Sequence, residues 1–214
     1  MLFFLLLSLS LASPPTVDLV PAEKEGCLDT TPKAIEAARA LEVAFLNAEE
    51  DQFLMLHREL QHEIKCMCSP PPVRDVAQLH RSLAIWQFVS GQYGASRGSW
   101  SAAKQLDPMW SIEAWGLPEG HQLRQLWDEA RQDTSRQSLR SPPGGWLIDG
   151  KPDTTVPSAR PALIQGFYAD NSLWHAGVAK SLAEIPTPPE DEEKKLRKRK
   201  GIRIGGSVGA GLCC

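Results

Sequence analysis

The sequence lacks an excess of basic residues. Its 23 lysine and arginine residues are outnumbered by 26 aspartates and glutamates, and the net charge at pH 7 is -3. Nucleic-acid binding needs a basic surface that neutralises phosphates, so this composition argues against it. With 42% hydrophobic and 23% charged residues, the 214-residue chain is typical of a globular protein with one large domain or two small ones.

The N-terminal apolar run is too short to cross a bilayer, which takes about 20 residues. It extends from Leu2 to Leu11 and is followed by small residues and prolines. Ser10-Leu11-Ala12 fits a signal-peptidase site, although no lysine or arginine precedes the run. We therefore predict a signal peptide over residues 1–12 and an exported protein of the periplasm or cell envelope. The first cysteine is Cys27, so we expect no lipid anchor at the cleavage site.

Recognisable catalytic motifs are also absent. The sequence contains no G-x-S-x-G motif, and its acidic residues form no pair typical of glycosidases. The one metal-like cluster consists of His62, Cys66 and Cys68, which is three candidate ligands where a structural zinc site uses four. We expect no catalytic residue, metal, cofactor or small-molecule substrate, and hence no enzyme.

Export would place the five cysteines where disulfides persist. The candidates for a disulfide are Cys27, Cys66 and Cys68, with Cys27 bonded to one of the other two. The sequence alone does not decide between these pairings.

Apolar residues at helical spacing predict a helical domain over residues 31–133, after a proline-rich leader over residues 13–30. Thr31 is a good N-cap and Pro32 suits the first helical position. The first predicted helix begins at Thr31. Four more are predicted from about Phe53 to Cys66, from Val73 to Ser90, from Tyr93 to Leu106, and from near His121 to Asp133.

The third and fourth of these helices carry the pattern of a helical hairpin. Small residues allow the two helices to cross closely, one large aromatic fills the gap, and a glycine turn and a final proline delimit the unit. The residues expected to pack in this way are Leu83, Ala84, Gly91, Tyr93, Ser96, Trp100, Ala103 and Pro108.

The segment from Ala77 to Pro108 resembles a tetratricopeptide repeat on these residues. It departs from the repeat at His80, where tryptophan is usual, and at Gln87, where tyrosine is usual. The resemblance implies stacked hairpins, with the fifth helix as a cap, whose concave face binds a protein or peptide; a plain helical bundle is the alternative. Trp110 and Trp115, in the connection that follows, are candidates to line a groove.

The periodicity changes after a predicted linker over residues 134–143. Short β-prone runs separated by Asp149-Gly150 and Asp170-Asn171 turns predict a small antiparallel β-module of three or four strands over residues 144–180. The fold class is therefore mainly α followed by a small antiparallel β-module, α+β overall. Because so short a sheet is only marginally stable by itself, we expect it to pack on the last helix or on a partner.

The segments "LDP", "GLPEGHQLRQLWDEAR" and "LIDGKPDTTVPSARPALIQ" occur in this order behind the apolar N-terminus. This combination resembles exported tetratricopeptide-type proteins of the Gram-negative cell envelope, especially those of myxobacteria, over residues 30–180. The last segment is also similar to small β-modules of the PEGA kind found beside envelope anchors. No activity is implied by these resemblances.

Residues 181–214 combine a charged linker with a glycine-rich tail, an ending that would also suit a truncated or frameshifted gene. Two functional hypotheses follow. The first is an exported scaffold module that binds a protein or peptide of the cell envelope through its helices. The second is a structural envelope tether whose residues 194–214 contact or enter a membrane.

Overall fold

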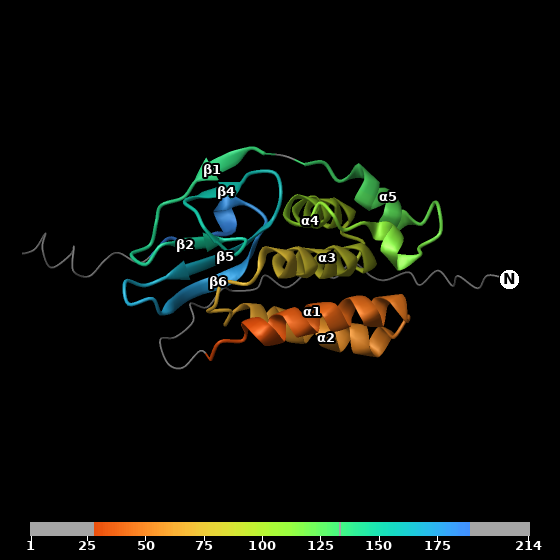
Figure 1. The fold of residues 1–214 in the computed structure, drawn as a ribbon, viewed down its shortest axis with the longest axis horizontal. Helices are drawn as coiled ribbons and strands as arrows, with labels where there is room; N and C mark the ends of the chain where they lie inside the picture. Colours follow the sequence, from red (N-terminus) through yellow and green to blue (C-terminus); the bar gives the residue numbers. More distant parts are fainter. Residues whose placement is uncertain (1–27, 133, 189–214) are drawn as a thin grey trace, which may run out of the picture.

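The fold is described by a computed structural model, which covers residues 28–132 and 134–188. Helices form the first part of the chain and short strands the second (Figure 1), so the predicted fold class is confirmed. The helical elements are α1 (Thr31–Leu46), α2 (Glu50–Ile64), α3 (Val73–Val89), α4 (Tyr93–Leu106), the 3-10 helix η1 (Ile112–Trp115), α5 (Gln122–Glu129) and the 3-10 helix η2 (Leu182–Glu184).

The strands of the described residues form two antiparallel sheets. A four-stranded sheet has the order β3-β2-β5-β6, and a two-stranded sheet pairs β1 with β4. The strands are β1 (Arg136–Ser138), β2 (Trp146–Ile148), β3 (Lys151–Pro152), β4 (Thr155–Pro157), β5 (Ala162–Phe167) and β6 (Leu173–Ala179).

The start of α1 corrects the expectation for its cap. Thr31 is the first residue of the helix, and Thr30 is its N-cap, without a side-chain capping hydrogen bond. Oδ1 of Asp29 accepts hydrogen bonds from the backbone N–H and the hydroxyl of Thr31, at 3.0 and 2.7 Å. The same carboxylate accepts from the backbone N–H of Cys68 at 3.1 Å and from the hydroxyl of Ser69 at 2.5 Å. Asp29 therefore fastens the start of α1 to the loop that follows α2.

Small residues lie where helices cross, both between the hairpins α1–α2 and α3–α4 and within the second hairpin. The Ser82 hydroxyl on α3 donates to the Ala38 carbonyl on α1 at 2.7 Å. The Ser96 hydroxyl on α4 donates to the Ala84 carbonyl on α3 at 2.8 Å. A side chain reaches the backbone of another helix only where the two helices approach closely, so these contacts fix the crossings. In Figure 1, α3 and α4 lie in successive layers above α1 and α2.

Helix α5 ends at Glu129, four residues before the predicted end at residue 133. Side chains of α4 bind carbonyl groups at this end of α5 and just beyond it. The Lys104 ammonium donates to the carbonyl of Trp127, and the Ser101 hydroxyl donates to the carbonyl of Arg131. α5 thereby caps the stack on the α4 side.

The β-module matches the predicted turns and differs in its extent. The turn at Asp149 and Gly150 has positive φ angles of 51° and 77°, as a tight hairpin requires. Residues 136–138, inside the predicted linker, instead form β1 and pair with β4. All three residues of β1 are exposed. Because no side chain of β1 is buried, its sequence carries no alternation of apolar and polar residues that would signal a strand.

The β-module contributes to the core of the helices and also has a hydrophobic cluster of its own, which includes Trp146, Ile164 and Trp174. Leu163 of β5 and Ala176 of β6 are buried in the same cluster as the apolar residues of the helices. Gly150 lies so close to the loop before α3 that a β-carbon there would collide with the carbonyl oxygen of Pro71. The sheet therefore packs on the helical hairpins themselves (Figure 1) and not on the last helix alone. No helix of the described residues is both long enough and apolar enough to cross a membrane.

Candidate functional site

The residues expected to pack in the hairpin lie along the contact between α3 and α4. Ala84, Ser96, Trp100 and Ala103 are almost completely buried. Gly91 connects the two helices with a φ of 73°. The remaining three lie nearer the surface: Leu83 is half-buried, and Tyr93 and Pro108 are exposed.

The two departures from the repeat pattern occur where α3 meets polar partners. Nε2 of His80 lies 3.4 Å from Oδ1 of Asp149, on the turn between β2 and β3. Oε1 of Gln87 accepts a hydrogen bond from the Ser99 hydroxyl of α4 at 2.8 Å. Both side chains on α3 are buried. Each position therefore holds a polar residue because its neighbour in the core is polar.

Asp149 is the centre of a buried network that joins the helices to the sheet. Its Oδ2 accepts from Nη1 of Arg160 at 2.8 Å, and its Oδ1 accepts from the backbone N–H of Leu163 at 2.9 Å. Burial acts to raise the pKa of Asp149, but the hydrogen bond from His80 and the charge of Arg160 bring that pKa below its ordinary value. The network thus holds a carboxylate in its charged form between the two parts of the fold.

The candidate groove residues Trp110 and Trp115 belong to a cluster of four tryptophan rings. The Trp110 ring is stacked on Trp100 with a centroid distance of 6.1 Å, and Trp115 meets Trp100 edge-on at 5.7 Å. Trp127 of α5 meets Trp100 edge-on at 5.3 Å. Trp110 and Trp115 are only partly exposed, because these ring contacts cover much of their surface.

Arg81 connects this cluster to α1. Its guanidinium lies 4.5 Å from the Trp110 ring centroid, with Nε 3.2 Å from the Glu42 carboxylate and Nη1 3.8 Å from Asp107. Burial raises the pKa of Glu42 despite the neighbouring guanidinium. Phe45 of α1 contacts Trp115, with ring centroids 6.5 Å apart. The segment 107–115 therefore lies across α1 and α3.

Cys66 and Cys68 lie just after the end of α2. Cys66 is disulfide-bonded, whereas its predicted partner Cys27 lies outside the described residues. Partial burial and the charge of Asp29 raise the pKa of the Cys68 thiol. Among residues 28–132 and 134–188, no group of three or more His, Cys, Asp and Glu side chains is arranged to bind a metal ion.

His57 is a buried histidine that the sequence did not single out. Its ring stacks on Trp86 with centroids 3.6 Å apart, and Nδ1 has no hydrogen-bond partner among the described residues. Burial lowers the pKa of His57 from 6.5 to about 4. The side chain therefore contributes as a neutral aromatic ring between α2 and α3 at neutral pH.

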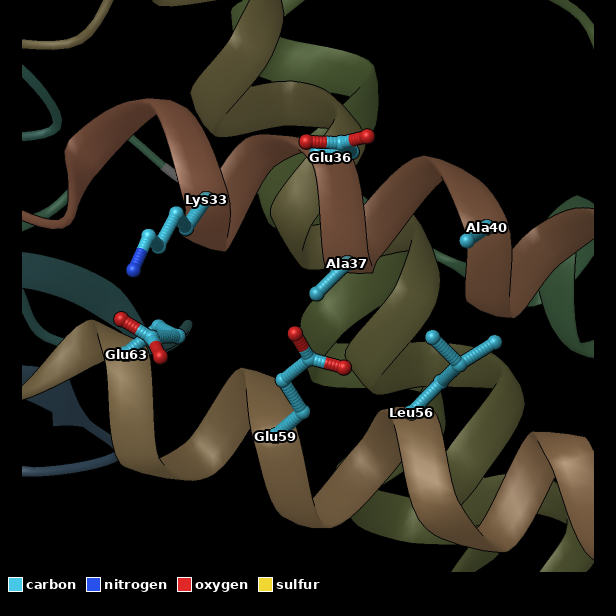
Figure 2. A pocket seen from close by; sticks show the side chains of 7 residues that line it. All are labelled: Lys33, Glu36, Ala37, Ala40, Leu56, Glu59 and Glu63. Atoms are coloured by element: carbon cyan, nitrogen blue, oxygen red, sulfur yellow. The ribbon is translucent and has the colours of Figure 1, made fainter.

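A groove opens between α1 and α2, on the face turned away from α3 (Figure 2). Its volume is about 370 Å³. Apolar side chains of both helices form its floor, and charged side chains stand along its borders. The residues that line it are Lys33, Glu36, Ala37, Ala40, Leu56, Glu59 and Glu63.

The charged side chains at the borders of this groove form no ion pair within the described residues, a property that they share with Glu50, Arg58 and Asp128. Elsewhere, carboxylates such as Asp75 and Glu129 form ion pairs with arginines, at 2.6 and 3.1 Å. Oε2 of Glu63 is moreover buried without a hydrogen-bond partner among the described residues. The groove thus carries three carboxylates and one ammonium, and Figure 2 shows Lys33 extending from α1 toward Glu63 on α2.

No family model, curated protein or solved structure matches this chain. The function must therefore be argued from its own surfaces, of which the α1–α2 groove is the strongest candidate. Sequence reasoning missed this groove, although its residues recur at helical spacing. Ala37 and Ala40 lie three residues apart on α1, and Glu59 and Glu63 four apart on α2. That spacing shows that each set shares one helix face, but not that the two faces meet.

Proposed function

We propose that this protein is a non-enzymatic scaffold module that binds a partner protein through the outer face of its α1–α2 hairpin. The observation that carries the proposal is the open groove on this face, with small apolar residues on its floor and unpaired charges at its border. Helix pairs commonly bind a partner by accepting a further helix in such a groove.

Two exposed apolar side chains extend this face beyond the groove. Val43 is 56% exposed and Met55 is 57% exposed. Val43 lies two helical turns after Glu36 and Met55 about one turn before Glu59, so each shares the flank of a groove-lining residue. Both side chains are therefore accessible to a protein bound along this hairpin.

The other face of α1 offers less room for a partner. There the segment 107–115 already contacts α1 and α3 through Asp107, Trp110 and Trp115. A peptide bound along these two helices would have to displace a tryptophan ring from the core. The outer face of α1–α2 requires no such rearrangement.

The cellular compartment in which this interaction takes place is also part of the proposal. Residues 1–12, which predict export, and residues 194–214, on which the membrane-tether hypothesis depends, both lie outside the described residues. The groove supports binding of a protein and does not bear on the compartment.

Site-specific photo-crosslinking tests the proposed function. A photoreactive amino acid is placed at Val43, at Met55 or, as the control, at Met109, which is 86% exposed on the connection after α4. We expect the same partner to be captured in cells from Val43 and Met55, and not from Met109. Capture should disappear in Ala40→Trp, which fills the groove. Equal capture from Met109, or capture that persists in a folded Ala40→Trp protein, would contradict the proposal.

A further inference from the structure

The charge around the groove points to the chemistry of its partner. Three carboxylates, of Glu36, Glu59 and Glu63, are opposed by the single ammonium of Lys33. Figure 2 shows Glu36 on α1 and the other two glutamates on α2, so carboxylates border the groove from both helices. A bound segment would therefore meet negative charge on both sides of its contact surface.

The floor of the groove suits a helix. Ala37 and Ala40 have small side chains, and Leu56 lies opposite them on α2 (Figure 2). Small residues let a third helix approach closely, because interaxial distance is set by the side chains at the contact. From Lys33 to Val43 the face is about 15 Å long, enough for almost three helical turns. An apolar stripe on the bound helix would cover this floor.

The same charges argue against two other occupants. In a symmetric dimer the face would meet its own copy, and three glutamates on each side would oppose three others with one lysine each. A lipid headgroup or nucleic-acid phosphate would also meet like charge. A cationic protein segment is the partner whose charges complement the glutamates.

On the basis of the proposed function, we propose that the α1–α2 groove recognises an amphipathic helix with lysine or arginine on both sides of its apolar stripe. The apolar stripe packs on Ala37, Ala40 and Leu56. The basic side chains pair with Glu36, Glu59 and Glu63, including the buried Oε2 of Glu63. Charge complementarity distinguishes this partner from other helices, and the apolar floor supplies a contact that any helix with an apolar stripe can make.

Three synthetic peptides of about 18 residues, or five helical turns, test this inference. They share one leucine and alanine stripe and differ only in the flanking residues, which are lysine, glutamine or glutamate. Binding to the full chain is measured by fluorescence anisotropy at low and at physiological salt. We expect the lysine peptide to bind at least about 10-fold more tightly than the glutamate peptide, with the difference reduced by salt.

Two variants assign the selectivity to the groove. Glu59→Gln/Glu63→Gln should weaken binding of the lysine peptide about 10-fold and leave the glutamine peptide unaffected. Glu119→Gln/Asp128→Asn, which also removes two carboxylates but at exposed positions away from the groove, should change neither. Melting temperature and helical content are recorded for each variant, so that loss of binding is not confused with unfolding.

The outcomes separate this inference from the proposed function. Equal binding of the three peptides, or a lysine preference that survives in Glu59→Gln/Glu63→Gln, would overturn the cationic-helix inference. Failure of all three peptides would also overturn it, while specific crosslinks from Val43 and Met55 would keep the proposed function. Absence of those crosslinks, with the lysine peptide still selected through the glutamates, would overturn the cellular role and retain the groove's chemical preference.

Discussion

The two helical hairpins have similar lengths but different surroundings. Helix α3 of the second hairpin is covered by α1, by α4, by the segment 107–115 and by the β2–β3 turn. The first hairpin packs on α3 with one face and leaves the groove between α1 and α2 on the other. One hairpin is thus enclosed by the rest of the fold, whereas the other is open on one side.

The charged residues of the two hairpins also differ, in whether they have a partner of opposite charge. Arg81 of α3 is buried and pairs with the carboxylate of Glu42, and the buried Arg160 pairs with the carboxylate of Asp149 beside α3. Glu36, Glu59 and Glu63 border the open face without an ion pair in the described fold. A buried charge must be paired to be tolerated, whereas a charge at the surface can remain available to a ligand. The enclosed hairpin therefore supports the fold, and the open hairpin is suited to binding.

The largest expected effect comes from the core of the enclosed hairpin. Trp100→Ala removes the ring at the centre of the tryptophan cluster and should lower the free energy of unfolding by about 3 to 5 kcal/mol. Urea denaturation measures the change. Tyr93→Ala, on the same helix but 42% exposed, is the control and should cost about 1 kcal/mol or less. If Trp100→Ala lost only about 1 kcal/mol, as expected for Tyr93→Ala, the core would not depend on Trp100.

A smaller loss is expected where the enclosed hairpin joins the sheet. Asp149→Asn leaves the buried Arg160 guanidinium without its carboxylate and should cost about 3 kcal/mol in the same assay. Asp153→Asn is the matched control, because its ion pair with Arg136 is at the surface and contributes about 1 kcal/mol or less. If both variants were equally stable, the contact between β-module and helices would not require the charge of Asp149.

The smallest effect concerns the boundary between the two hairpins and depends on pH. The pKa of His57 is lowered from 6.5 to about 4, so between these values the unfolded chain binds a proton that the folded chain does not. Stability should therefore fall as the pH decreases through this window, by about 1 to 3 kcal/mol for this side chain.

His57→Phe isolates this contribution, because phenylalanine can stack on Trp86 and does not titrate. The wild-type protein should lose stability relative to this variant between pH 7 and pH 4, as measured by urea denaturation at each pH. A difference that stays constant with pH would refute the assignment to His57.

Local patterns in the sequence were enough for much of the helical region. The bounds of α4 agree with the prediction, Gly91 has the expected left-handed conformation, and Trp100 is buried as expected. Each of these features depends on residues within a few turns of one another, so spacing along the chain reveals them. The Asp149-Gly150 turn was predictable for the same reason, because two-residue hairpins demand positive φ angles.

Contacts between distant segments were beyond the reach of these patterns. Asp149 was recognisable as a turn residue, but not as the partner of His80, which is 69 positions away in the sequence. β1 was missed because its exposed residues pair with β4 through the backbone, which any side chain permits. The groove has the same origin, since its residues belong to two helices.

The sequence by itself determined the order of helices and strands, the turns and the large residues of the core, because these follow from local conformational preference and hydrophobic periodicity. Only the tertiary structure decided that segment 107–115 crosses α1 and α3, that the β-module contributes to the helical core, and that unpaired glutamates of α1 and α2 border one groove. These features depend on which helix faces meet, and a face that packs on another helix has the same spacing as one left open for a partner.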